Sequence, residues 1–194
     1  MKYLITGKNG QLAKAFARRF EAGSIEYLAP DESRCDITSA ATIGELVASY
    51  RPGIIINCAA YNLVDPAEQE REKAFAVNAE GPRILAEAAS RQGAHLVHFG
   101  SDYVFDGTKE NGLYREVDPE NPLNEYGRSK GAGEKAVREV LGSRSLVLRL
   151  SWVFGEGKQN FIAKLLDWSR GQEFLKVACD EFSVPTWTAT VVDV

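Results

Sequence analysis

The sequence has few cysteines and histidines and no long apolar run. Its 194 residues include three cysteines and two histidines. Cys35, Cys58 and Cys179 are odd in number and widely spaced, which argues against a disulfide framework or a cysteine metal cluster. No apolar stretch approaches the ~20 residues that cross a bilayer, and the apolar run at the start is too short for a signal peptide. We therefore expect a cytoplasmic protein without a membrane partner.

An excess of positive charge is also missing. The net charge is −4, whereas proteins that bind nucleic acid or anionic membranes carry basic patches. Hydrophobic residues make up 44% of the chain and charged residues 26%, as in ordinary globular domains. We expect a small-molecule ligand and no nucleic-acid partner.

Short apolar runs alternate with helical patterns along the chain. The runs predict strands and the patterns predict helices: strands at residues 3–6, 25–28, 54–57, 96–99 and 146–150, and helices at 11–20, 71–91 and 126–141. This alternation predicts an α/β fold with a doubly wound parallel sheet of the Rossmann type. Ligands of such sheets bind outside the carboxyl ends of the strands. Gly7, Ala59, Ser101 and Trp152 follow four of these strands.

A glycine turn follows the first predicted strand. Gly7, Gly10 and Ala13 form a Gly-x-x-Gly-x-x-Ala pattern that opens a helix. Such a pattern permits a tight turn, a close approach of the backbone to a pyrophosphate, and tight packing of the helix on the sheet. The helix N-terminus then offers N–H donors to the phosphates. Two glycines alone occur in many turns, but this position predicts a dinucleotide site.

The sequence leaves the choice between NADP(H) and NAD(H) open. A single acid at the end of the second strand favours NAD, but the segment here holds Asp31, Glu32 and Arg34. Arg34 or Lys8 could meet a 2′-phosphate, and Asp31 or Glu32 could repel it. The small residues after the third strand, Asn57 to Ala60, suit either a floor under the cofactor or tight packing.

Tyr126 and Lys130 lie four residues apart, so they share one face of the predicted helix. A nearby ammonium lowers the pKa of a tyrosine toward the range of a working acid or base. Transfer of a hydride to a ketone builds negative charge on its oxygen, which then needs a proton and hydrogen-bond donors. Tyr126 can supply the proton and Ser101 a hydrogen bond. Judged alone, Tyr-x-x-x-Lys is typical of a solvated helix face and a strand-end serine of a turn.

Asn78 lies within the apolar stripe of the 71–91 helix, where a polar side chain needs a partner. Pro82 has no N–H and crowds the carbonyl of Asn78. The freed carbonyl could anchor a proton-relay water behind Lys130, or Pro82 could simply kink the helix. Both readings stay open.

These motifs together resemble the dTDP-4-dehydrorhamnose reductase family, within the extended short-chain dehydrogenase/reductase superfamily. The segments that carry the resemblance are spread over nearly the whole chain: residues 5–12, 57–65, 101–107, 122–127 and 149–155. The resemblance implies NAD(P)H-dependent reduction of the 4-keto group of dTDP-4-dehydro-6-deoxy-L-mannose to dTDP-L-rhamnose. It also implies that the partner is a nucleotide sugar.

The resemblance assigns roles to individual residues. It implies Tyr126 as general acid, Lys130 as its pKa modulator and ribose contact, and Ser101 as the hydroxyl that meets the carbonyl. The implied cofactor residues are Gly7, Gly10, Gln11, Leu12, Asp36, Ile37, Ala59, Ala60, Tyr61, Asn78, Tyr126 and Lys130. The implied substrate residues are Tyr103, Val104 and Trp152.

The chain departs from the family pattern in length and at a few positions. Ala13 replaces a more usual glycine, and Asn62 and Pro66 stand where threonine and lysine are frequent. We expect a dinucleotide-binding domain at residues 1–155 and only the beginning of a substrate lobe at 156–194, where 181–187 resembles its start. The resemblance also implies a possible Mg²⁺ ion and a possible homodimer, although the sequence offers no metal-ligand cluster.

Three alternatives remain at this point. A nucleotide-sugar epimerase or dehydratase has the same fold, and the residues after Ser101 favour the reductase over it. A non-catalytic subunit resembling the methionine adenosyltransferase β subunit is a second alternative, which the intact Tyr126, Lys130 and Ser101 argue against. A cofactor-binding fragment without activity is the third.

Overall fold

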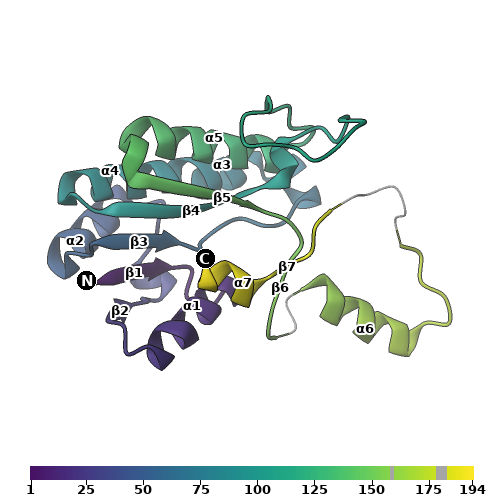
Figure 1. Cartoon of the computed structure of the whole chain (residues 1–194), viewed down its shortest axis with the longest axis horizontal. Helices are drawn as coiled ribbons and strands as arrows, with labels where there is room; N and C mark the ends of the chain where they lie inside the picture. The colour runs from purple at the N-terminus through teal and green to yellow at the C-terminus, as the bar shows by residue number, and fades with distance from the viewer. Residues whose placement is uncertain (158–159, 178–182) are drawn as a thin grey trace.

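The computed structural model describes residues 1–157, 160–177 and 183–194. Five parallel strands form one sheet in the order β2-β1-β3-β4-β5 (Figure 1). Their bounds are β1 Tyr3–Thr6, β2 Tyr27–Leu28, β3 Ile54–Asn57, β4 His95–Ser101 and β5 Ser145–Leu150. The predicted doubly wound parallel sheet is confirmed. β2 is shorter than predicted because the Ile25 N–H bonds the Phe20 carbonyl at the end of the preceding helix (2.8 Å).

Helices cover both faces of the sheet, which makes three layers. On one face lie α2 (Ala40–Tyr50), α4 (Gly81–Gln92) and α5 (Glu125–Leu141), and on the other lie α1 (Gln11–Ala22) and α7 (Thr188–Asp193). Side chains alternate along each strand, so Leu4 packs toward the first group and Ile5 toward the second. Burial of each such side chain contributes roughly 1.5–3 kcal/mol. Helix α2 was not predicted from the sequence.

The predicted helix at 71–91 is interrupted. It consists of α3 (Arg71–Phe75), a π-helical turn (Ala76–Glu80) and α4. Pro82 has no N–H to give to the Asn78 carbonyl, which explains the wider turn. That carbonyl points toward α5, where a Cβ at Gly133 would lie 2.0 Å from it. Short 3₁₀ turns elsewhere span Glu32–Arg34, Asp65–Glu68, Asp102–Val104 and Gly142–Arg144.

After β5 the chain leaves the sheet and then returns to it. β6 (Val153–Phe154) pairs in parallel with β7 (Thr186–Trp187). Between them α6 (Phe161–Gly171) extends away from the sheet, whereas α7 lies back against α1 (Figure 1). Of the predicted start of a substrate lobe, Glu181 and Phe182 lie outside the described residues.

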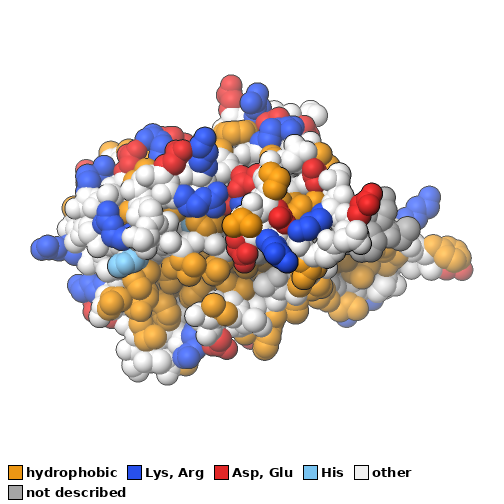
Figure 2. Space-filling view, turned by 45° about the horizontal axis from the view of Figure 1, so that its top comes forward, with side chains coloured by type: hydrophobic (Ala, Val, Ile, Leu, Met, Phe, Trp, Pro, Cys, Tyr) orange, Lys and Arg blue, Asp and Glu red, His pale blue; other side chains and the backbone are white. Residues whose placement is uncertain are grey.

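The surface mixes charges of both signs. On the face drawn in Figure 2, positive and negative side chains are interspersed, and hydrophobic side chains gather in a broad band below them. No helix in the described part of the chain is long and apolar enough to cross a membrane.

Candidate active site

A cleft of about 690 Å³ opens at the carboxyl ends of β1, β3 and β4. The chain passes from β1 to β2 on one side and then to β3 on the other, so the strand order reverses between β1 and β3. Parallel sheets bind ligands at such reversals. Predicted site residues that line the cleft are Gly10, Gln11, Leu12, Ala59, Ala60, Ser101, Tyr103, Tyr126, Lys130 and Trp152.

The glycine turn forms one edge of this cleft. Gly7 has a φ of +68°, and a Cβ there would lie 2.7 Å from the Ala59 N, so only glycine fits between β1 and β3. Gly10 N–H donates to the Gly7 carbonyl (2.8 Å) and starts α1. Among the residues that the structure describes, no side chain caps α1, and no acidic residue lies in its first turn. Its first N–H groups therefore suit an anionic group such as a pyrophosphate.

A buried chain of polar groups fixes the floor of the cleft. The Thr6 hydroxyl donates to Asn57 Oδ1 (2.6 Å), and Ala59 N–H donates to the Thr6 hydroxyl (3.2 Å). The Asn57 amide donates to His98 Nδ1 (3.1 Å), which assigns the His98 proton to Nε2. Burial, helped by the Lys130 charge, holds the pKa of His98 well below its usual range, so the ring is neutral.

Gln11 offers a free acceptor to a ligand. Its amide nitrogen donates to the Val153 carbonyl (2.8 Å), which turns the side chain into the cleft wall. Its Oε1 is buried and has no hydrogen-bond partner among the described residues. A buried unpaired acceptor is costly unless a ligand satisfies it. This atom and the glycine turn together fit a dinucleotide.

Ser101, Tyr126 and Lys130, the predicted catalytic residues, meet in the cleft. Ser101 ends β4, and Tyr126 lies in the first turn of α5, which Asn124 caps by accepting from Gly127 N–H (2.7 Å). Lys130 is 3% exposed and donates to the Phe99 carbonyl (2.6 Å). All three residues thus line one cleft, and their catalytic roles stay a prediction.

The sequence predicts that Lys130 lowers the pKa of Tyr126, and in this structure that prediction is wrong because the pKa is raised. Burial raises the pKa of Tyr126 to about 12, although a hydrogen bond with Ser101 opposes this rise. Burial also lowers the pKa of Lys130 to about 8, because the desolvated ammonium is only partly compensated by Glu134. The lysine charge is directed at the Phe99 carbonyl, and the Tyr126 phenol stays protonated at neutral pH.

Four other predicted cofactor residues do not line the cleft: Asp36, Ile37, Tyr61 and Asn78. Asp36 accepts from Thr38 N–H (2.9 Å), and Ile37 packs beneath Gly81. The Asn78 side chain is fully occupied: its Oδ1 accepts from Tyr61 N–H (2.9 Å), and its amide donates to the Tyr61 carbonyl (2.9 Å) and to the Ser129 hydroxyl (3.0 Å).

The predicted substrate residues divide in the same way. The Tyr103 ring packs edge-on against the Tyr126 ring at 5.5 Å between centroids. Trp152 has a φ of +42° and packs edge-on against Phe161 at 4.5 Å. Both line the cleft, whereas Val104 is fully buried below it.

Sequence reasoning missed a hydrogen-bonded cluster around Asp102. Its Oδ2 accepts from the hydroxyls of Ser151 (2.6 Å) and Ser183 (2.9 Å), and its Oδ1 accepts from Ser101 (3.3 Å). The cluster connects the end of β4 to the segments beside β6 and β7. Asp102 follows Ser101 directly, but its other partners are 49 and 81 residues away, and no local signal indicates them.

The expected Mg²⁺ gains no support from the structure. Within residues 1–157, 160–177 and 183–194, no group of three or more His, Cys, Asp or Glu side chains could hold a metal ion.

Known proteins similar to this chain carry one recurrent name. A dTDP-4-dehydrorhamnose reductase of Aggregatibacter actinomycetemcomitans is 40% identical over 194 residues, which are 100% of this chain and 65% of that protein. One from Burkholderia thailandensis is also 40% identical, over 100% of this chain and 64% of that protein. The chain thus spans just under two thirds of the length of these curated relatives.

Solved structures agree with this similarity. A dTDP-4-dehydrorhamnose reductase of Clostridium acetobutylicum has a TM-score of 0.94 and 34% identity, over 100% of this chain and 68% of that one. One from Bacillus anthracis in complex with NADP has a TM-score of 0.94 and 36% identity, over 99% of this chain and 68% of that one. Residues 1–194 also match the family described as the RmlD substrate binding domain. With its glycine turn and its Ser101–Tyr126–Lys130 site at the sheet's carboxyl edge, the chain belongs to this RmlD family.

Proposed function

We propose that the chain binds a nicotinamide dinucleotide and reduces the 4-keto group of dTDP-4-dehydro-6-deoxy-L-mannose to dTDP-L-rhamnose. The observation that carries this proposal is the meeting of Ser101, Tyr126 and Lys130 in the cleft whose other edge is the glycine turn. The names of the curated relatives support the reaction and the dTDP sugar.

The site residues suit a carbonyl reduction. A bound reduced nicotinamide would supply the hydride. Tyr126 holds a proton on its phenol oxygen at neutral pH because burial raises its pKa, so it is poised to act as an acid. Ser101 can donate a hydrogen bond to the developing oxyanion, and the Lys130 ammonium adds positive charge in a dry site where it is weakly screened.

We propose that the cofactor is NADP(H) or NAD(H). The first turn of α1 and the Gln11 side chain would hold it. Lys8, within the glycine turn, pairs with Asp31 (3.0 Å), so the positive charge that could attract a 2′-phosphate is partly balanced. The NADP complex of the Bacillus anthracis relative supports NADP(H) as one accepted form.

Assembly, location and domain division are also proposals. We propose a homodimer in the cytoplasm, with residues 1–155 as the dinucleotide-binding domain and residues 156–194 as the beginning of a substrate lobe. The exposed apolar side chains of α6 support a separate role for the second segment.

The test is anaerobic turnover of the keto sugar with NADPH and with NADH, with the product identified as dTDP-L-rhamnose. We expect stoichiometric consumption of at least one reduced cofactor. NADPH binding is measured separately by fluorescence. Binding without turnover would contradict the reductase proposal and leave a cofactor-binding chain, and retention of a bound oxidised cofactor would point to an epimerase or dehydratase.

A further inference from the structure

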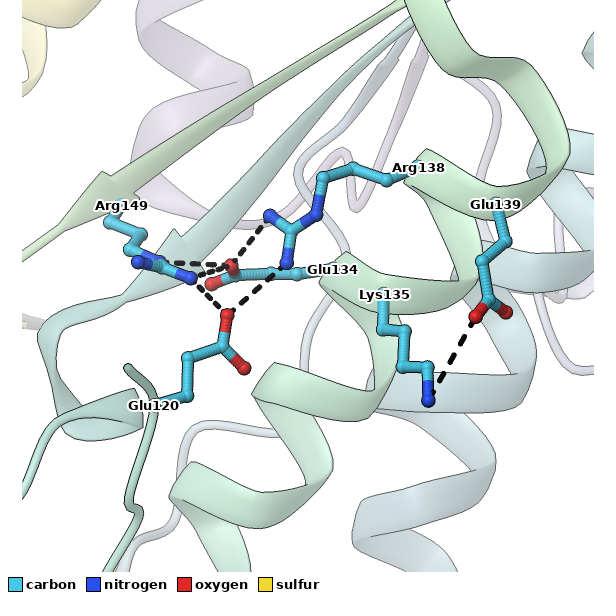
Figure 3. Close-up of polar contacts among 6 residues, drawn as sticks. All are labelled: Glu120, Glu134, Lys135, Arg138, Glu139 and Arg149. Carbon is cyan, nitrogen blue, oxygen red and sulfur yellow. Dashed lines mark hydrogen bonds and ion pairs between the residues drawn. The ribbon is translucent and has the colours of Figure 1, made fainter. Parts of the chain in front are cut away.

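A carboxylate is fully buried one helical turn beyond Lys130. Glu134 is 0% exposed and lies four residues after Lys130, so both side chains share one face of α5. A buried carboxylate is costly unless it is paired. Glu134 Oε2 accepts from Arg149 Nε (2.9 Å) and from Arg138 Nη1 (3.2 Å), and Figure 3 shows these contacts.

The two arginines also connect this carboxylate to the loop beside the cleft. Arg138 and Arg149 both form ion pairs with Glu120, and the distance from Arg138 Nη2 to Glu120 Oε1 is 3.2 Å. Glu120 belongs to the segment that leads from Phe105 to the cap of α5. The Arg149 guanidinium lies over the Phe105 ring, 4.9 Å from its centroid. The cluster therefore ties α5, β5 and this loop together.

The backbone of β4 makes room for the carboxylate. A Cβ at Gly100 would lie 2.0 Å from Glu134 Oε1, so a side chain there would displace it. The neighbouring residue, Phe99, accepts the hydrogen bond from Lys130 (2.6 Å). Glu134 and Lys130 thus rest on consecutive residues of the same strand. Oε1 is buried and has no hydrogen-bond partner among the described residues, so this oxygen of the carboxylate faces β4 and is not taken up by the arginines.

The other charged and titratable groups around Lys130 do not replace this charge. The carboxylate of Asp102, which lines the same cleft, is taken up by the hydroxyls of Ser151 and Ser183. From α5 come the protonated Tyr126 and the cation of Arg138, from β5 the cation of Arg149, and from β4 the neutral ring of His98. Glu120 is 31% exposed and lies beyond the arginines. Glu134 is the buried anion on the face of α5 that carries Lys130, and it raises the pKa of Lys130 against the effect of burial.

We propose that Glu134 is a positioning residue for the reaction: its buried carboxylate, held by Arg138 and Arg149 over Gly100, keeps Lys130 a charged ammonium in the cleft that Tyr126 also lines. This proposal rests on the proposed reductase function only for its effect on turnover.

The electrostatic part is tested without turnover. In protein labelled with [¹³Cε]lysine, the NMR signal of Lys130 is assigned by its loss in Lys130→Met and then titrated. The midpoint is expected near pH 8 in the parent chain and about one pH unit lower in Glu134→Gln. The matched control Glu120→Gln removes a carboxylate from the same arginines and is expected to move the midpoint by less than about half of that.

A second variant keeps the test decisive if Glu134→Gln fails to fold. Arg149→Gln removes a cation from Glu134, so the midpoint of Lys130 should rise. An unchanged midpoint in Glu134→Gln, an equal shift in Glu120→Gln, or a fall in Arg149→Gln would each overturn the proposal.

Turnover supplies the functional arm. The alkaline limb of kcat should move to lower pH in Glu134→Gln by the same amount as the NMR midpoint. If the NMR midpoint of Lys130 shifts in Glu134→Gln but the alkaline limb of kcat does not move, Glu134 has no role in the reaction. Absence of turnover in the parent chain would count against the reductase function and leave the titration result intact.

Discussion

The two sides of the cleft are built differently. On the sheet side, Ser101, Tyr126 and Lys130 are themselves buried, and Lys130 is anchored by the buried Phe99 carbonyl. On the other side, α6 has no buried residue, and its apolar residues Ile162, Leu166 and Trp168 are 45%, 56% and 47% exposed. The first side is part of a closed core, and the second is an apolar helix face left open.

Under the proposed function, this difference separates the residues of the proposed chemistry from those of the proposed substrate contact. Tyr126, Lys130 and Ser101 are held by contacts within β4, α5 and the turn after β4, so under the proposed function their arrangement is set before a ligand binds. Trp152 and Phe161 rest on each other at the border of α6, where few buried contacts restrain them. We expect changes on the sheet side to alter kcat and stability, and changes on the α6 side to alter KM.

The largest expected effect is on kcat. Tyr126→Phe removes the proposed proton donor and keeps the buried ring, so kcat should fall about 10²- to 10⁴-fold while the Kd for NADPH stays within about twofold. Trp152→Ala, on the other side, should raise KM for the keto sugar more than it lowers kcat. Steady-state kinetics with the dTDP keto sugar and fluorescence titration of NADPH measure both. Equal kcat in Tyr126→Phe would exclude the phenol as the acid.

The next effect concerns stability. Leu85 of α4 is 0% exposed, and Leu166 of α6 is 56% exposed. Leu85→Ala should lower the free energy of unfolding by about 2–5 kcal/mol through the lost burial and the cavity, and Leu166→Ala by no more than about 0.5 kcal/mol. Urea unfolding measures the difference. A comparable loss in Leu166→Ala would mean that α6 is as well packed as the core.

The sheet side was the more predictable from sequence. Strands and the glycine turn carry local signals, namely apolar runs and residues that a tight turn requires. The helix at Ala40–Tyr50 was missed. Pro82 indicated that the Asn78 carbonyl loses its helical bond, but the contact of this carbonyl with Gly133 of a distant helix has no local signal.

The site was predictable where its chemistry is local. Tyr126 and Lys130 follow a four-residue spacing, and Ser101 follows a strand. The environment was not predictable, since the pKa of Tyr126 is set mainly by burial, which no local pattern encodes. The same holds for contacts between separate segments, such as those of Asp102 with Ser151 and Ser183 and of Glu134 with Arg149.

A smaller effect tests the close packing behind the site. A Cβ at Gly133 would lie 2.0 Å from the Asn78 carbonyl, whereas a Cβ at Gly44 of α2 has nothing within 4 Å. Gly133→Ala should cost about 1–3 kcal/mol of stability through overpacking. Gly44→Ala should increase stability by about 0.5–1 kcal/mol, since alanine favours the helix. Denaturant unfolding measures the free energy of unfolding of both variants. An increase in Gly133→Ala would contradict the close approach of Gly133 to the Asn78 carbonyl.

The smallest effect is a pH dependence confined to the sheet side. His98 is buried and its folded pKa is depressed, whereas the unfolded residue takes up a proton below about pH 6.5. The unfolded state therefore binds more protons as pH falls, and stability present above about pH 6.5 is lost below it, by at most about 1.4 kcal/mol per pH unit. His98→Gln should reduce this slope between about pH 6.5 and 5. The exposed His95, at the start of the same strand, is the matched control, and His95→Gln should keep the slope. If His98→Gln unfolds with the same pH dependence as the parent chain, the neutral buried ring is not the group whose protonation opposes folding.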